Sequence, residues 1–301
     1  MARVDSISQI SLKNILFLTD FSEPSEAALP FAANVARRFG SKVYALHVFM
    51  PAVYSYTTPE LTVAAIETEE ENAKAEMLGV ESQLSGLPHE TMVERGLGLW
   101  EAVQQAIRDF KIDMVVLGTH GRTGAEKFLL GSVAEEIFRR APVPVLTIGP
   151  GVHSSLHNGG RFHRVLFATD FTDASLAAAT HAVALAQENQ ARLVLLHVMR
   201  HPRERTAEEK RRFELSVAEA IHRLYETVPK DAELHFQPEV AVEYGEPAER
   251  IVEAAKGRGA DLIVLGVRDA KGRMGAATHL ERATAHKVVA HASCPVLTVR
   301  G

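Results

Sequence analysis

The chain repeats itself, and this duplication limits the possible folds more than any other feature of the sequence. The segment LFLTDF at 16–21 returns as LFATDF at 166–171. The match continues in order with ALHV at 45–48 and LLHV at 195–198, DMVVLG at 113–118 and DLIVLG at 261–266, and PVLT at 144–147 and 295–298. The number of residues between each segment and its repeat hardly changes along the chain. The sequence therefore predicts two similar domains in tandem, with small differences between their loops.

Each copy alternates short apolar runs, rich in β-branched residues, with longer helical patterns. This order is typical of a parallel sheet whose strands are joined by crossover helices, and strands that are apolar throughout are buried on both faces. We therefore predict an α/β fold of two tandem doubly wound domains, each a five-stranded parallel sheet with helices on both faces. In the first copy we predict strands at 14–19, 42–49, 90–94, 114–118 and 145–148, and helices at 24–39, 59–84, 99–110 and 132–140.

The stretch GPGVHSSLHNGGR between the copies has the glycine, serine and asparagine content of a linker. We predict a first domain at 1–150, a linker at 151–160 and a second domain at 161–301. With 301 residues, 46% of them hydrophobic, the chain can supply a core for each domain. Three histidines in and near the linker lack the companions of a recognised metal motif, so we expect solvated side chains there and no metal; they are His153, His157 and His163.

The net charge of −5 offers no general attraction to nucleic acids or anionic membranes, so neither is an expected partner.

Cys294 is the only cysteine, which excludes an intramolecular disulfide and suits a reducing compartment. Its place before Pro295, at the start of an apolar run, predicts a small buried hydrophobe instead of a nucleophile. The apolar run at 15–18 is too short for a signal peptide or a membrane span, so we expect a cytoplasmic protein without membrane insertion.

The stretch after the strand at 114–118 has the residues of a phosphate-binding loop. Gly118, Gly121 and Gly131 allow positive φ and close approach of the backbone to a ligand. Ser132 begins an amphipathic helix, whose free N–H groups and dipole favour phosphate. Doubly wound folds bind ligands at this edge of the sheet, so a nucleotide is the expected ligand.

Each of these residues also has a purely structural interpretation. Ser132 with Glu135 matches a capping box, and glycines commonly end strands. Asp20, directly after the first strand, is suited to an Asx turn or a helix cap, and equally to accepting hydrogen bonds from a ribose or an adenine.

The spacing of Gly118, Gly121, Gly131 and Ser132 is GxxG, nine residues, then GS, and it resembles the pattern of ATP-binding universal stress proteins. The TDF at 19–21, the ALHV at 45–48 and both PVLT segments are similar to that family as well, so the resemblance covers both copies. It implies ATP as the ligand, with or without a Mg²⁺ ion held mainly by phosphate oxygens.

The resemblance also implies roles for single residues. Asp20 and the backbone at Val48 would bound the adenosine part of the nucleotide. The four motif residues, with amides such as that of Val133, would bind ribose and phosphates. His120 and Arg122 lie in the same loop and are further candidates for phosphate contact.

The second copy departs from this pattern. After Gly266, Asp269 stands where the second glycine is expected, and its carboxylate would repel phosphate. Arg282 and Ala283 replace the glycine and serine at the helix start. Asp170 and Val198 are retained, and Lys271 and Arg273 of the same stretch can still attract an anion. We predict a degenerate site that binds ATP weakly or not at all.

We find no set of residues for catalysis: the run Gly40, Ser41, Lys42 lacks the upstream glycine of a Walker A loop, and no nucleophile with a base is recognisable. The leading hypothesis is a stress-response protein that binds ATP in its first domain and passes its state to an unknown protein partner. A nucleotide-independent interaction module and a slow ATP hydrolase are the alternatives.

In the resembled family the last strands of two domains commonly pair, which implies an intramolecular pseudo-dimer and is compatible with a homodimer.

Overall fold

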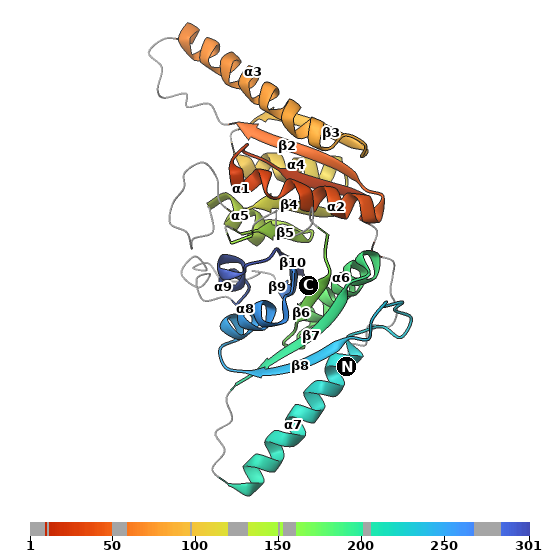
Figure 1. Ribbon diagram of the computed structural model, residues 1–301. Helices are drawn as coiled ribbons and strands as arrows, with labels where there is room; N and C mark the ends of the chain where they lie inside the picture. Colours follow the sequence, from red (N-terminus) through yellow and green to blue (C-terminus); the bar gives the residue numbers. More distant parts are fainter. Residues whose placement is uncertain are drawn as a thin grey trace. The chain divides into compact units, whose positions relative to one another are not determined.

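A computed structural model of the chain describes residues 10, 12–49, 59–96, 98–119, 132–149, 151–152, 161–200, 206–267 and 284–301. These residues group into two compact units, one holding β1 to β5 and the other β6 to β10 (Figure 1).

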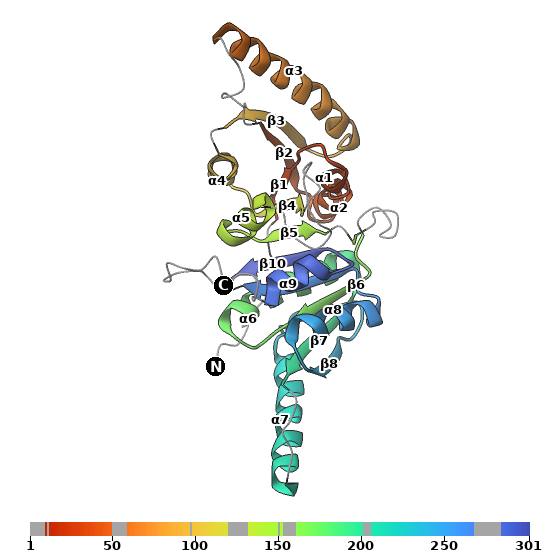
Figure 2. The same cartoon turned by 90° about the vertical axis from the view of Figure 1, so that its left-hand side faces the viewer.

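The first unit is a sheet of five described parallel strands in the order β3-β2-β1-β4-β5. Helices cover both faces, with α1 and α2 on one side and α4 and α5 on the other (Figure 2). Its elements are β1 (Asn14–Leu18), α1 (Glu23–Glu26), α2 (Leu29–Phe39), β2 (Lys42–Phe49), α3 (Pro59–Gln83), β3 (His89–Arg95), α4 (Leu99–Asp109), β4 (Met114–Gly118), α5 (Ser132–Arg140) and β5 (Val145–Ile148). The central strand is buried on both faces, since Ile15, Leu16 and Phe17 have no exposed surface.

The second unit repeats this architecture in its described residues, with parallel strands in the order β8-β7-β6-β9-β10. Its elements are β6 (Arg164–Ala168), α6 (Asp173–Asn189), β7 (Arg192–Met199), α7 (Ala207–Glu226), β8 (Glu239–Tyr244), α8 (Pro247–Arg258), β9 (Leu262–Val267), α9 (Thr284–His291) and β10 (Val296–Arg300). The predicted doubly wound α/β fold, duplicated in tandem, is confirmed. Among the described helices, none is both long enough and apolar enough to cross a membrane.

The predicted element bounds in the first copy agree with the structure to within one residue, except for the helix expected at 24–39. This helix is divided into α1 and α2, and Pro30 stands in the first turn of α2. Proline has no N–H to donate and its ring clashes with the carbonyl four residues earlier, so it cannot continue a helix from α1. The second copy has Thr180 at this position, and α6 is continuous.

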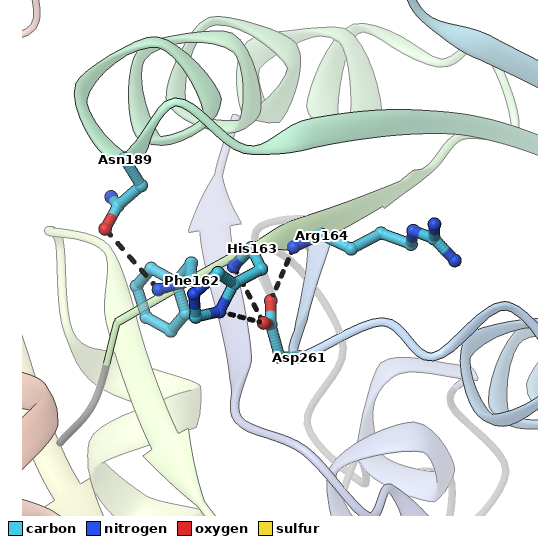
Figure 3. Close-up of polar contacts among 5 residues, drawn as sticks. All are labelled: Phe162, His163, Arg164, Asn189 and Asp261. Atoms are coloured by element: carbon cyan, nitrogen blue, oxygen red, sulfur yellow. Dashed lines mark hydrogen bonds and ion pairs between the residues drawn. The ribbon is translucent and has the colours of Figure 1, made fainter. Parts of the chain in front are cut away.

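The aspartate directly before β9 binds the start of β6 at the amino edge of the second sheet (Figure 3). The Asp261 carboxylate accepts the backbone N–H groups of His163 at 2.7 Å and of Arg164 at 2.9 Å. The His163 Nδ1 lies 3.3 Å from the same carboxylate. Asp113 accepts the N–H groups of residues 13 and 14 in the same way in the first unit. His163 therefore belongs to a local strand contact, while the predicted linker histidines 153 and 157 lie outside the described residues.

Candidate functional site

The chain order of the strands marks one edge of each sheet as the place for a ligand. The chain runs from β1 outward to β3, then returns to add β4 and β5 on the other side of β1. Open α/β sheets bind ligands beyond the carboxyl ends of the strands at such a reversal. Asp20 follows β1, Val48 lies near the end of β2, and Gly118 ends β4. The structure thus brings these three predicted residues to one edge of the first sheet.

Asp20 lies in a turn that short-range hydrogen bonds hold in place. Its Oδ1 accepts the backbone N–H of Ser22 at 3.1 Å and also the hydroxyl of Ser22. Phe21 has a φ of 60°, which is uncommon for a bulky residue, and its N–H donates to Thr19 Oγ1 at 3.0 Å. The Asx turn predicted as the structural alternative is therefore present, and it orients the Asp20 carboxylate at the end of β1.

Gly118 is required by packing. A Cβ at this position would lie 2.5 Å from the carbonyl oxygen of Pro24, and no positive φ is found there. Gly266 has the same role in the second unit, where a Cβ would lie 2.1 Å from the Ala174 carbonyl oxygen. Gly118 therefore does not use the positive φ that a glycine allows, and the close approach of α1 explains the absence of a side chain.

The rest of the predicted phosphate loop can be placed only in part. His120, Gly121, Arg122 and Gly131 lie outside the described residues. Helix α5 begins at Ser132, as predicted, with Val133 in its first turn, while the side chains of Ser132 and Val133 also lie outside the described set. The start of α5 follows β4 in the chain, on the route from β4 to β5.

The second unit contains a cavity of about 170 Å³ at the corresponding edge. It lies at the carboxyl ends of β6, β7 and β9 and at the starts of α8 and α9. The residues that line it are Ala168, Thr169, Asp170, Thr172, Ser175, Leu196, Val198, Pro247, Ile251, Leu265, Gly266, Thr284 and Ala285. This lining combines an apolar wall with a cluster of hydroxyls and one carboxylate.

The polar side of the cavity repeats the turn that follows β1. Asp170 Oδ1 accepts the N–H of Thr172 at 3.1 Å and its hydroxyl at 2.6 Å. The hydroxyls of Thr169 and Ser175 lie 2.8 Å apart. Phe171 has a φ of 61°, close to that of its counterpart in the first unit. The two copies therefore share the turn and its aspartate, whatever the differences in their following loops.

The α8 side of the cavity was not predicted from the sequence. Pro247 and Ile251 line it, and Ile251 is 5% exposed. The available signal was the apolar face of the helix after β8, but such a face also packs against a sheet in any α/β domain. The spacing of apolar residues along a helix does not distinguish a helix that lines a cavity from one that packs in the core.

Cys294 is buried, as predicted, at 2% exposure. Burial raises the pKa of its thiol to about 12, and the negative charge of Asp261 contributes in the same direction. The thiolate is the nucleophilic form, so a thiol with this pKa is inert at neutral pH. Within the described ranges, no three His, Cys, Asp or Glu side chains come together as a metal site.

Comparison with known proteins places both copies in one family. The model of the Universal stress protein family matches residues 11–149 and 161–300. A universal stress protein of Mycolicibacterium smegmatis is 29% identical over 304 residues, which cover 95% of this chain and 96% of that protein. Another, from Methanocaldococcus jannaschii, is 34% identical over 143 residues, which cover 45% of this chain and 81% of that protein.

A solved structure shows the same fold over the whole chain. The crystal structure of a universal stress protein from Archaeoglobus fulgidus superposes with a TM-score of 0.70 and 21% sequence identity, covering 97% of each chain. The tandem arrangement of two such domains is therefore shared with a protein of known structure.

Proposed function

The chain belongs to the universal stress protein family, and from this premise we propose that its first domain binds ATP and that the protein acts as a nucleotide-dependent sensor or regulator. The ligand would occupy the carboxyl edge of β1, β2 and β4, with its phosphates toward the start of α5. Any Mg²⁺ would be held mainly by phosphate oxygens.

One combination of observations carries this proposal. The motif that runs from Gly118 to Ser132 joins the end of β4 to the N-terminus of α5, and Asp20 is held at the end of the neighbouring strand β1. A helix N-terminus next to a glycine-rich loop offers N–H groups and a favourable dipole to phosphate. A carboxylate fixed by a turn is suited to accept hydrogen bonds from ribose hydroxyls.

The proposed role is binding and signalling. A bound nucleotide would change the surface that a protein partner meets at the carboxyl edge of the first sheet, because it adds charge and hydrogen-bonding groups there. Hydrolysis would be slow at most, since the sequence supplies no recognisable set of nucleophile, base and orienting residue.

The first test is to denature freshly purified protein and to identify the released nucleotide by chromatography and mass spectrometry. The proposal expects roughly one ATP per chain, because one domain carries the complete motif. Mostly ADP would favour the slow hydrolase. Two nucleotides per chain would contradict the restriction to the first domain.

A titration of ATP into the full chain locates the site. Gly121→Asp places a carboxylate in the loop, as the second copy does at Asp269, and should abolish ATP binding. Gly79→Asp is the matched control, because Gly79 is exposed on α3 and no atom lies within 4 Å of the position that its Cβ would take. Equal affinity of Gly121→Asp and the native chain would overturn the placement.

The interaction-module alternative has one observation in its favour. Gly118 and the Asx turn of Asp20 have structural explanations, and both recur in the second unit as Gly266 and Asp170, where the phosphate motif is absent. If the purified chain releases no nucleotide and added ATP does not bind, this alternative becomes the better account.

A further inference from the structure

Helix α7 connects β7 to β8 in the second unit, and the sheet covers little of it. Of its 20 residues, all of which the structure describes, only Ala220 and Leu224 are buried. Figures 1 and 2 show its first half extending away from the sheet of this unit. Leu215 is 63% exposed and Tyr225 is 53% exposed. Single exposed apolar side chains are normal, whereas a contiguous group of them marks an interaction surface.

The exposed side of α7 carries a regular row of residues. Arg211, Leu215, Ala218, His222 and Tyr225 follow one another at spacings of four, three, four and three residues, and all five are exposed. This heptad spacing places side chains in one line along a helix, as in the contact line of a coiled coil. By the period of the helix, the row lies opposite the two buried residues. We call these five residues the α7 row.

The corresponding helix of the first unit, α3, has a different outward surface. Leu78 is 64% exposed there. Its neighbours one turn away are Lys74, Ala75, Glu81 and Ser82, which are charged, small or polar. Leu78 is therefore an isolated exposed leucine. A position between the second and third strands of the domain does not by itself account for the α7 row.

The α7 row is complementary to itself when a second copy packs against it in the antiparallel direction. Ala218 is the central residue, and its small side chain lets two helices approach closely. A two-fold axis at Ala218 brings Arg211 of one copy to Tyr225 of the other, which makes a cation–π contact. It also brings Arg212 near Glu226, which lies on the same side of the row, and these two form an ion pair. Each contact occurs twice, as in every isologous interface.

The charges on α7 are available for such contacts. Within one chain Arg212 pairs with Glu208, and Glu226 pairs with His222, but these side chains are exposed, so neither charge is held in a buried ion pair. A parallel arrangement would place Arg211 against Arg211 of the second copy, and like charges that face each other oppose association. The antiparallel arrangement is therefore favoured.

We propose that α7 is a self-association surface, and that its partner is α7 of a second copy of this chain, packed antiparallel about Ala218. One pair of helices is at the small end of specific interfaces, so the association depends on protein concentration. The proposed function does not use this surface, and the association does not require a nucleotide. It also differs from pairing between last strands, since β8 and β10 lie at opposite edges of the second sheet.

Sedimentation equilibrium of the full chain without added nucleotide measures the association. Leu215→Glu places a charge in the α7 row and should weaken self-association at least about tenfold. Leu78→Glu is the matched control, because Leu78 has nearly the same exposure on α3, and it should leave the association unchanged. Thermal unfolding checks that both variants are folded, as expected for changes at exposed positions.

Charge reversal tests the antiparallel arrangement. Arg212→Glu and Glu226→Arg should each weaken self-association by about three- to tenfold, because each leaves like charges opposed at two equivalent places. The double variant restores opposite charges across the interface and should recover most of the native affinity. A double variant that is as weak as the single variants would overturn this arrangement.

A cysteine at the axis locates the contact. Two copies of residue 218 would lie within disulfide distance, so mild oxidation of Ala218→Cys should give a covalent dimer. Ala75→Cys on α3 is the exposed control and should remain mainly monomeric on a denaturing gel. Cys294, the only native cysteine, is buried and should not contribute. A native chain that is monomeric at about 200 µM, or a dimer that neither responds to Leu215→Glu nor cross-links at residue 218, overturns the proposal.

Discussion

The imidazole Nδ1 of His47 lies 2.9 Å from the backbone carbonyl oxygen of Thr19. A carbonyl oxygen can only accept a hydrogen bond, so Nδ1 carries the proton in this contact. The His47 ring also packs on Phe21, with 4.3 Å between ring centroids. The end of β2 is thereby joined to the turn that holds Asp20.

Replacing His47 by phenylalanine should destabilise the first unit by about 1–2 kcal/mol, because the ring contact can persist while the Thr19 carbonyl loses a donor. Urea denaturation followed by circular dichroism measures this cost. His197→Phe is the matched change, since His197 Nδ1 lies 2.8 Å from the Thr169 carbonyl oxygen. A cost below about 0.3 kcal/mol for both variants would mean that the hydrogen bond does not stabilise the turn.

The second prediction concerns the helix that is continuous in one copy and divided in the other. Thr180→Pro should destabilise the second unit by about 3 kcal/mol, because α6 loses a backbone hydrogen bond and the ring clashes with the preceding turn. Urea denaturation measures the loss, and Thr180→Ala is the control without backbone effects. A negligible cost would show that the division between α1 and α2 is set by surrounding packing and not by Pro30.

The repeated fold could be predicted from the sequence because both copies contain the same alternation of apolar runs and helical segments. Strands such as β4 and β9 are apolar runs that begin after an aspartate and reach a glycine at or near their ends, and this agreement makes their assignment secure. The aspartates were nevertheless not predicted to contact the starts of β1 and β6. That contact joins residues about a hundred positions apart, and only the tertiary structure brings them together.

The candidate site was predicted less completely, for two physical reasons. Gly118 was expected to allow a positive φ and the close approach of a ligand, but the close approach of Pro24 requires the glycine, and sequence alone does not distinguish these causes. The cavity in the second unit depends on how α8 packs over the sheet, and the apolar face that carries Ile251 has the pattern of any core helix.

The third prediction concerns the reactivity of Cys294. With a thiol pKa raised to about 12 and 2% exposure, Cys294 should not react with a thiol-specific reagent at pH 8 while the protein is folded. Reaction should become complete after denaturation. Ser293→Cys combined with Cys294→Ala moves the thiol to the adjacent exposed position and should react in the folded state. Rapid labelling of the native chain would contradict the burial of Cys294.

The fourth prediction is a pH dependence of stability from His181 in α6. Burial lowers the pKa of its imidazole below the usual value near 6.5, and a smaller contribution from the Ala177 carbonyl opposes this shift. The unfolded chain therefore takes up a proton at higher pH than the folded one. The contribution to stability is fully present above pH 6.5 and is lost as the pH falls through 6.5 toward the lower folded value.

His181→Phe should remove this contribution, since the first copy has Phe31 at the corresponding position with no exposed surface. The free energy of unfolding should fall less steeply between about pH 7 and pH 5.5 in the variant than in the native chain. Parallel curves for the two proteins would show that His181 does not titrate differently in the folded and unfolded states.

The last prediction separates glycines that are needed for packing from glycines that are needed for a ligand. Gly118→Ala should destabilise the first unit by about 1–3 kcal/mol even without nucleotide, because the added methyl group would meet the backbone of Pro24. Gly266→Ala should have a cost of at least this size in the second unit, where the approach of Ala174 is closer. Gly79→Ala is the control within a helix and should stabilise by roughly 0.5–1 kcal/mol. If Gly118→Ala leaves the unfolding free energy unchanged and reduces only ATP affinity, the glycine serves the ligand, and the packing explanation for both copies fails.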